Sequence, residues 1–210
     1  MPDFQKGQYM SKIILASKSP RRIELLKMCN INFNNLVADI DEDLIKSDIL
    51  ATFKEENTFE QAEILTKKLA YEKALYIYKE NPDHLVIGSD TLVVTDKSIL
   101  GKPKDPQDAY IMLRELSGQV HRVYTGVSII GPGYENTFVS IAQVKFYDFD
   151  PAMDQIIIDY IASGSPMDKA GGYGIQDMGA LLVEYIEGDY YTIMGLPLGQ
   201  VYRKLKAHLY

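Results

Sequence analysis

Apolar and polar positions alternate along this chain in two ways, and together the two patterns predict the order of its secondary structure. Short apolar runs bounded by glycine, proline or acidic residues are typical of buried strands. Two longer runs of β-prone residues flank Gly131-Pro132-Gly133 and predict a hairpin. On this basis we expect strands near residues 13–16, 85–94, 120–130, 137–149, 180–186 and 190–194.

Helices are predicted where a capping residue precedes a longer polar and apolar stretch. Ser19-Pro20, Asp105-Pro106 and Asp150-Pro151 each combine an N-cap residue with a proline at the first helical position. Thr58-Phe59-Glu60-Gln61 fits a capping box, and Pro197 begins a C-terminal helix. We therefore expect helices at about 20–30, 58–80, 106–118, 151–164 and from 197 onward, with a polar, irregular segment at 32–57.

This order of elements indicates an α/β fold with a mixed sheet, because helices and strands alternate while hairpins are also present. The chain has 210 residues, enough for one domain or one domain with two lobes. We expect a flexible arm at residues 1–11, followed by a single α/β domain over residues 12–210.

Composition excludes several classes of protein. A net charge of −7 without a long Lys/Arg run argues against non-specific binding to nucleic acid. No apolar stretch approaches the roughly 18 residues that a membrane span needs, and the N-terminus lacks the apolar core of a signal peptide. The single Cys29 allows neither an internal disulfide nor a cysteine-based zinc cluster. The sequence predicts a soluble, cytoplasmic protein.

Asp90 stands where an apolar side chain is expected. With the two-residue period of a strand it shares a face with Gly88 and Leu92, and burying a carboxylate there costs on the order of several kcal/mol unless a cation or hydrogen-bond donors meet it. Gly88 leaves room for a ligand to approach. These observations favour a metal ligand or a general base at Asp90. The alternative is an edge-strand aspartate that caps a turn.

Lys73 is the second residue out of pattern. At 100° per residue it lies in the middle of the apolar stripe of the helix predicted at 58–80, beside Leu69 and Ile77. A lysine on that face either points into an anion site or runs its alkyl chain along the apolar surface to reach water.

Three further clusters have the chemistry of phosphate binding. Residues 17–22, Ser-Lys-Ser-Pro-Arg-Arg, lie where a strand meets a helix N-terminus, so backbone N–H groups, the helix dipole and two guanidinium groups converge there. Gly101-Lys102-Pro103 places a lysine on a stiff turn. Residues 169–174 combine Lys169 with a glycine-rich loop. The first cluster is equally consistent with a well-capped helix that carries exposed arginines.

These clusters, in this order, resemble the Maf family of nucleotide pyrophosphatases. The matching segments are residues 15–22, 41–42, 72–74, 88–91, 101–103, 124–126, 169–176 and 195–197, and the match spans about 13–205. The resemblance implies an elongated mixed α/β sheet with helices on both sides and two lobes around a central cleft, similar to the inosine triphosphatase fold. It also implies hydrolysis of nucleoside triphosphates to monophosphate and pyrophosphate with a divalent cation, Mg²⁺ or Mn²⁺, in a protein that is often a homodimer.

The resemblance also implies roles for individual residues. Asp90 matches the proton acceptor, Glu42 and Asp90 the metal carboxylates, and Lys73 and Lys102 catalytic contacts to the triphosphate. The expected phosphate contacts are completed by Ser17, Arg22 and Lys169. The positions that separate the subgroups of the family are occupied by Arg21, Thr91 and Gln176. This triplet is that of the pyrimidine subgroup, which acts on dTTP, UTP and modified pyrimidine triphosphates.

Two other functions remain open at this point. One is a nucleotide-binding regulator of cell division and septum formation with vestigial hydrolysis; pure binding would not need the water-activating carboxylate. The other is a purine house-cleaning enzyme of the inosine triphosphatase type, against which Thr91 and Gln176 argue only through the resemblance. In each case the expected partner is a nucleoside triphosphate, with no stable nucleic acid and no membrane.

Overall fold

The computed structural model of the chain describes residues 13–206, so the arm predicted at residues 1–11 lies outside the described residues. The strands are β1 (Ile13–Ala16), β2 (Asn34–Leu36), β3 (Leu85–Val94), β4 (Ile99–Leu100), β5 (Val120–Gly131), β6 (Tyr134–Phe146) and β7 (Val183–Glu187). The α-helices are α1 (Pro20–Met28), α2 (Glu42–Thr52), α3 (Thr58–Glu80), α4 (Pro106–Leu116), α5 (Pro151–Ala162), α6 (Tyr190–Met194) and α7 (Leu198–Lys206). Short 3₁₀ turns are η1 (Ser165–Asp168), η2 (Ala170–Gly172) and η3 (Met178–Leu182).

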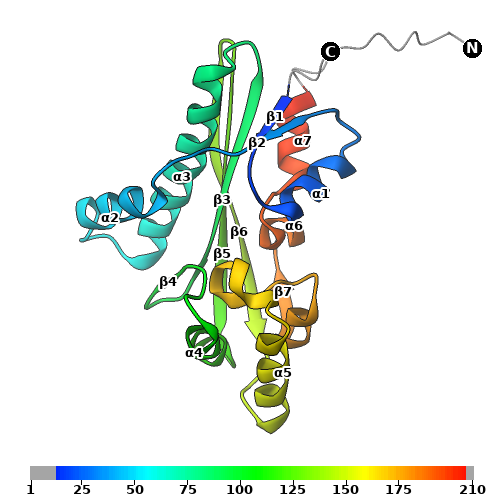
Figure 1. The fold of residues 1–210 in the computed structure, drawn as a ribbon. Coiled ribbons are helices and arrows are strands. Elements are labelled where there is room, and N and C mark those ends of the chain that lie inside the picture. Colours follow the sequence, from blue (N-terminus) through cyan, green and yellow to red (C-terminus); the bar gives the residue numbers. More distant parts are fainter. Residues whose placement is uncertain (1–12, 207–210) are drawn as a thin grey trace, which may run out of the picture.

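The strands form one mixed sheet in the order β2-β1-β3-β5-β6-β7, with β4 paired to β3. β1 is parallel to β2 and to β3, whereas the β3, β5, β6 and β7 pairs are antiparallel. Figure 1 shows α3 along one side of the long strands and α1, α6 and α7 gathered beside β1 on the other side. The α/β class, the mixed sheet and the helices on both sides are therefore confirmed.

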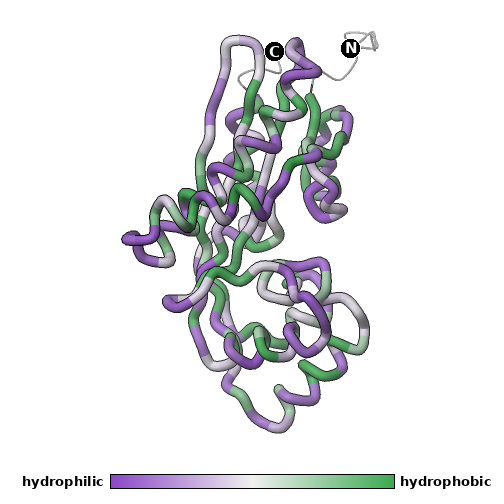
Figure 2. Tube along the Cα trace, turned by 60° about the vertical axis from the view of Figure 1, so that its left-hand side comes forward, coloured by the Kyte–Doolittle hydropathy of each residue, from purple (hydrophilic) through white to green (hydrophobic). Residues whose placement is uncertain are grey.

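Buried side chains form four clusters along the sheet, and two of these clusters mark the two lobes that the long strands join. One cluster gathers β1, α1, α7 and the first half of β3, with Leu15 and Ile87 fully buried. Another gathers α4, α5 and the second half of β3, with Val93 and Phe146 buried. Figure 2 shows these upper and lower groups of elements joined by long strands. The two-lobed architecture is confirmed. Among the described residues, no helix combines the length and apolar character that crossing a membrane requires.

Two segments differ from their prediction because local capping outweighs composition. Residues 190–194 form helix α6 instead of a strand: the Asp189 side chain accepts a hydrogen bond from the backbone N–H of Tyr191, and Gly195 ends the helix in the left-handed region at φ 106°. The irregular segment predicted at 32–57 contains β2 and α2, where the Asp41 side chain accepts from the N–H of Leu44. The acidic residues there cap a helix.

Smaller differences concern boundaries. The strand predicted at 180–186 begins only at Val183, after the 3₁₀ turn η3. The capping box of α3 is real but starts one residue earlier, with Asn57 as the N-cap and Glu60 bonded back to it.

Gly88 serves helix packing, and the prediction that it makes room for a ligand was wrong. A Cβ atom at Gly88 would clash with the backbone of α3, 2.7 Å from the nitrogen of Ala74 and closer still to the oxygen of Ala70. Glycine therefore allows α3 to lie directly on β3. Because Lys73 precedes Ala74, this close approach brings Lys73 beside the same strand that carries Asp90.

Candidate active site

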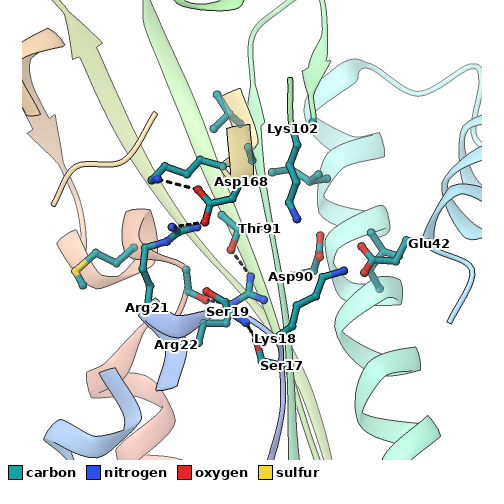
Figure 3. Close-up of a pocket in the computed structure, with 18 of the residues that line it drawn as sticks. Ser17, Lys18, Ser19, Arg21, Arg22, Glu42, Asp90, Thr91, Lys102 and Asp168 are labelled. Carbon is teal, nitrogen blue, oxygen red and sulfur yellow. Dashed lines mark hydrogen bonds and ion pairs between the residues drawn. The ribbon is translucent and has the colours of Figure 1, made fainter. Parts of the chain in front are cut away.

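A cleft of about 850 Å³ opens between the two lobes. All the site residues predicted from the sequence line it: Ser17, Arg21, Arg22, Glu42, Lys73, Asp90, Thr91, Lys102, Lys169 and Gln176. They come from six segments of the chain that are far apart in sequence. Figure 3 shows Glu42 and Asp90 on one side of the cleft and Arg21 and Asp168 on the other.

The cleft opens at an interruption in the sheet. β1 pairs with β3 only as far as Gly88, and β4 pairs with the same edge of β3 only from Val93. Between these points no strand of the described chain covers that edge, although β5 pairs continuously along the other edge. Asp90 lies in this gap, within a strand that is otherwise interior. The alternative of an edge aspartate that caps a turn does not describe its position.

On one side of the gap, three residues form what we call the helix wall: Glu42, Lys73 and Asp90. The Lys73 ammonium lies 2.6 Å from an Asp90 carboxylate oxygen and 3.1 Å from a Glu42 oxygen. The side chains of Lys73 and Asp90 are only 12% and 11% exposed. The ammonium thus compensates the buried carboxylate, as the cost of burying charge requires. Lys73 points into the cleft and does not run along the apolar surface to water.

Arg22 forms the floor of the cleft. Its guanidinium donates to the backbone oxygens of Gly195 and Ser89 and to the Thr91 hydroxyl, each at 2.8 Å. Burial lowers the pKa of Arg22, and the nearby Asp90 charge opposes that shift. Three of the five guanidinium N–H donors are therefore used inside the protein, where they tie α1 to β3 and to the end of α6. The predicted contact of Arg22 with phosphate therefore has to use the two guanidinium N–H donors that remain.

Thr91 is held by a directed chain of hydroxyl groups. The Thr125 hydroxyl donates to the backbone oxygen of Thr192 at 2.8 Å, and it lies 3.0 Å from the Thr91 hydroxyl. Because each hydroxyl has one proton, Thr91 must donate to Thr125 while it accepts from Arg22. The Thr91 hydroxyl proton is thus committed within the protein.

Across the cleft lies what we call the loop wall: Asp168, Lys169, Gln176 and Asp177. Lys169 is buried, and its ammonium meets four oxygens: the Ser165 backbone oxygen, the Ser165 hydroxyl at 3.0 Å, Asp168 at 2.8 Å and Asp177 at 3.3 Å. An ammonium has three protons, so these acceptors saturate it. As placed, Lys169 braces the loop, and its predicted phosphate contact would require these bonds to rearrange.

The other predicted residues lie at the rim of the cleft and just before the N-terminus of α1. Lys102 and Gln176 are exposed and line the cleft. The buried Ser17 hydroxyl accepts from the N–H of Ser19 at 3.1 Å and so orders the turn before α1. Ser19 occupies the N-cap position but makes no side-chain cap bond, so the first N–H groups of α1 remain available to an anion.

Comparison with known proteins identifies the family of this chain. The family model for Maf-like proteins matches residues 12–208. This chain belongs to the Maf family. It is 46% identical over 197 residues to a dTTP/UTP pyrophosphatase of Geobacillus sp. (strain WCH70), covering 94% of this chain and 98% of that protein.

Two further relatives of this Maf protein carry the same name. A dTTP/UTP pyrophosphatase of Thermosipho africanus (strain TCF52B) is 45% identical over 191 residues, covering 91% of this chain and 90% of the relative. One of Aquifex aeolicus (strain VF5) is 42% identical over 197 residues, covering 93% and 94%. Each similarity extends over nearly the whole chain and so includes both lobes of the cleft.

Sequence reasoning missed two residues that shape the Maf site. Asp168 contacts Arg21 from 147 residues away, and no periodicity or spacing marks such a pair. Thr125 is part of the matched segment 124–126, but its hydroxyl contact with Thr91 depends on the pairing of β3 with β5. The signal for Asp168 was its position next to Lys169, which is a weak one.

The donor set suits a hard divalent cation. Glu42 and Asp90 both contact the Lys73 ammonium and both line the cleft, so the two carboxylates lie close together beside it. Within residues 13–206 no group of three or more His, Cys, Asp or Glu side chains is arranged to hold a metal ion. Two carboxylates with an open cleft beside them match the way Mg²⁺ is usually held, with substrate phosphates and water completing its shell.

Proposed function

We propose that this Maf protein hydrolyses dTTP and UTP to the nucleoside monophosphate and pyrophosphate, and so removes selected nucleotides, modified pyrimidine triphosphates among them, from the pool. The observation that carries the proposal is the buried Asp90 carboxylate, held by Lys73 at the gap in the sheet and open to a cleft lined with cations. The names of the relatives from Geobacillus, Thermosipho and Aquifex support the same activity and substrates.

Asp90 acts as the general base in this proposal. Its carboxylate takes a proton from a water molecule whose oxygen attacks the α-phosphorus. The new bond joins that oxygen to the α-phosphorus, and the bond that breaks joins the α-phosphorus to the oxygen bridging it to the β-phosphate. Pyrophosphate leaves with the electron pair of that bond. Lys73 fixes the direction of the Asp90 carboxylate through their 2.6 Å contact.

The leaving pyrophosphate needs positive groups around it. Lys18 and Lys102 line the cleft with exposed side chains. The uncapped N–H groups at the start of α1 add donors that suit phosphate oxygens. These groups bind and orient the triphosphate so that its α-phosphorus faces Asp90.

A divalent cation belongs to this proposal, and Glu42 and Asp90 are the residues that would hold it. When bound, Mg²⁺ or Mn²⁺ supplies charge neutralisation on the phosphate oxygens. Lys73 lies between the two carboxylates and keeps them together by contacting both.

Base selection is assigned to Arg21, Thr91 and Gln176. The Gln176 amide offers one donor and one acceptor group, which matches the O4 and N3–H edge of uracil and thymine. The Thr91 hydroxyl has no free proton, because it donates to Thr125. Arg21 lies at the opposite side of the cleft from Glu42, beside the loop wall.

A substrate panel tests the proposal. Pyrophosphate release is measured from dTTP, UTP, CTP, ITP, GTP and 7-methyl-GTP, each with Mg²⁺ and with Mn²⁺. We expect dTTP and UTP to have the highest kcat/KM. Faster turnover of ITP or GTP would instead assign the protein to the inosine triphosphatase type of activity. Binding of dTTP without release of pyrophosphate would favour a regulatory role.

A further inference from the structure

We propose that Asp168 is a positioning residue that sets the selectivity of the cleft for the pyrimidine base by orienting Arg21; this rests on the proposed function. Asp168 ends the turn η1 in the lower lobe, whereas Arg21 lies in the first turn of α1 in the upper lobe. Their side chains meet at 3.2 Å across the cleft. Figure 3 shows the Asp168 carboxylate between the Arg21 guanidinium and the ammonium group of a second side chain.

The contact belongs to a chain of alternating charges. Arg21 contacts Asp168, Asp168 contacts Lys169 at 2.8 Å, and Lys169 contacts Asp177 at 3.3 Å. Asp177 also accepts hydrogen bonds from the Ser165 hydroxyl and from the N–H of Gly179, so its place in the loop is fixed. Gln176 directly precedes Asp177. The chain therefore joins Arg21 to the segment that carries Gln176, and these are two of the residues assigned to the base.

The contact is poorly placed to stabilise the fold. The side chain of Asp168 is 59% exposed and that of Arg21 is 26% exposed, and exposed ion pairs contribute little to stability because water screens them. Lys169 by contrast is buried, and all three of its ammonium protons have acceptors. It contacts one oxygen of the Asp168 carboxylate while Arg21 contacts the other. Although burial alone would raise the pKa of Asp168, the hydrogen bond from Lys169 and the charge of Arg21 outweigh it and lower that pKa. Asp168 therefore stays negative at neutral pH.

The neighbours of Arg21 explain why it needs such a partner. The partly buried Arg22 guanidinium lies close enough for their charges to repel. Without Asp168, the Arg21 side chain would turn away from Arg22, toward solvent or the phosphates of a bound nucleotide. It would still attract any triphosphate, but it would no longer be presented from a fixed direction. We therefore expect loss of Asp168 to weaken discrimination between bases more than it weakens turnover in general.

A double-mutant cycle tests this inference. The proteins are the wild type, Asp168→Asn, Arg21→Gln and the double variant, and the readout is kcat/KM for dTTP, UTP, CTP and GTP. We expect Asp168→Asn to lower the ratio of kcat/KM for dTTP to kcat/KM for CTP by about tenfold, and the corresponding ratio of UTP to GTP by the same factor. This is the effect expected when one polar contact to the base is misdirected. In the Arg21→Gln background, Asp168→Asn should change these ratios by less than twofold. Asp168→Glu, which keeps the charge, should restore part of the selectivity.

The matched control is Asp148→Asn, which removes an exposed carboxylate of the lower lobe that contacts Lys145 outside the cleft. It should leave all four substrates unchanged. If Asp168→Asn changed kcat/KM equally for every substrate, it would show only a general charge effect. If the fold-changes in selectivity of Asp168→Asn and Arg21→Gln simply multiplied in the double variant, the two residues would act independently. Either result overturns the inference.

Equilibrium binding of the same four nucleotides to the same variants separates this inference from the proposed function. If the wild type releases no pyrophosphate but Asp168 and Arg21 remain coupled in binding selectivity, the proposed hydrolysis fails and the positioning role stands. If the wild type hydrolyses dTTP and UTP but the coupling is absent in both measurements, the positioning role fails alone.

Discussion

On the helix wall, Lys73 and Asp90 are 12% and 11% exposed, whereas across the cleft the Asp168 carboxylate of the loop wall is 59% exposed. Both walls hold ammonium and carboxylate groups in contact, but their supports differ. The charges of the helix wall stand on α2, α3 and the central strand β3, and those of the loop wall stand on 3₁₀ turns and their connections.

This difference shows where burying a charge serves the function. Burying the Lys73 ammonium and the Asp90 carboxylate costs hydration free energy. The packing of α3 against Gly88 fixes the geometry of this pair. Such a rigid pair suits a proton transfer, in which the base must face one reacting atom. The exposed contact between Arg21 and Asp168 contributes little stability, so a change there should leave the fold intact while it alters how Arg21 is presented to the base. We expect variants of the helix wall to abolish turnover and variants of the loop wall to change selectivity.

The largest effect is expected for Asp90→Asn. The change keeps the shape of the side chain but removes the base, and loss of a general base lowers kcat by about 10² to 10⁴. Binding of dTTP should stay within about tenfold of the wild type. The matched control is Asp96→Asn, an exposed aspartate outside the cleft just beyond β3, which should keep full activity. More than a tenth of wild-type activity in Asp90→Asn would remove Asp90 from the role of base.

Lys73→Met should also lower kcat by orders of magnitude, and it should destabilise the protein. Without the ammonium, the buried Asp90 and the more exposed Glu42 lose the cation that both contact, which costs up to about 3 kcal/mol. Urea unfolding measures this cost, and adding Asp90→Asn to Lys73→Met should recover part of it. Lys68→Met, on an exposed face of the same helix, is the control. Normal activity with reduced stability would make Lys73 a purely structural residue.

On the loop wall, Gln176→Glu should lower kcat/KM for dTTP and UTP by about tenfold. A carboxylate only accepts hydrogen bonds, so it would repel the O4 oxygen of uracil and thymine. Thermal stability should hardly change, because Gln176 is exposed. Gln107→Glu, at an exposed position of α4, makes the same change away from the cleft. Undiminished turnover of dTTP and UTP in Gln176→Glu would show that the loop wall does not contact the base there.

The smallest effect concerns the support beneath the loop wall. Tyr173 lines the cleft, and its hydroxyl lies 2.8 Å from Nε2 of the buried His121. Burial lowers the pKa of His121 to about 3. The native state therefore stays unprotonated where the unfolded state binds a proton, so stability falls as the pH drops from about 6.5 toward 3.

The cost for His121 is about 1.4 kcal/mol at pH 5.5, one unit below the ordinary histidine pKa. Urea unfolding of the wild type and of His121→Gln at pH 7.5 and pH 5.5 measures it. The variant should lose about that much less stability between the two pH values. Equal pH dependence in both proteins would mean that His121 is not held neutral in the native state.

The secondary structure was predictable wherever a local signal specified it. The capping pairs at Asp105 and Asp150 mark helices whose ends the structure reproduces within two residues. The hairpin at 131–133 is also present, with its second strand three residues nearer the turn than predicted. The prediction failed at 190–194, where β-prone residues form a helix because Asp189 and Gly195 cap both ends. It failed again at Asp41, where the acidic residues begin α2.

The site was predictable as a set of residues but not as a set of contacts. Burial cost singled out Asp90 and Lys73, and the resemblance supplied the remaining members, all of which line one cleft. The sequence alone determined which chemical groups the protein has available, because these follow from residue type. It also determined the helix starts that a proline marks, at Pro20, Pro106 and Pro151.

Only the tertiary structure decided which of those groups are free to act. Lys169 is saturated by the loop, Arg22 is largely engaged by β3 and the end of α6, and Asp168 holds Arg21 from the opposite lobe. These contacts join residues up to 173 positions apart in the chain. Their geometry follows from strand register and from α3 lying on Gly88, which are properties of the folded sheet that no local pattern encodes.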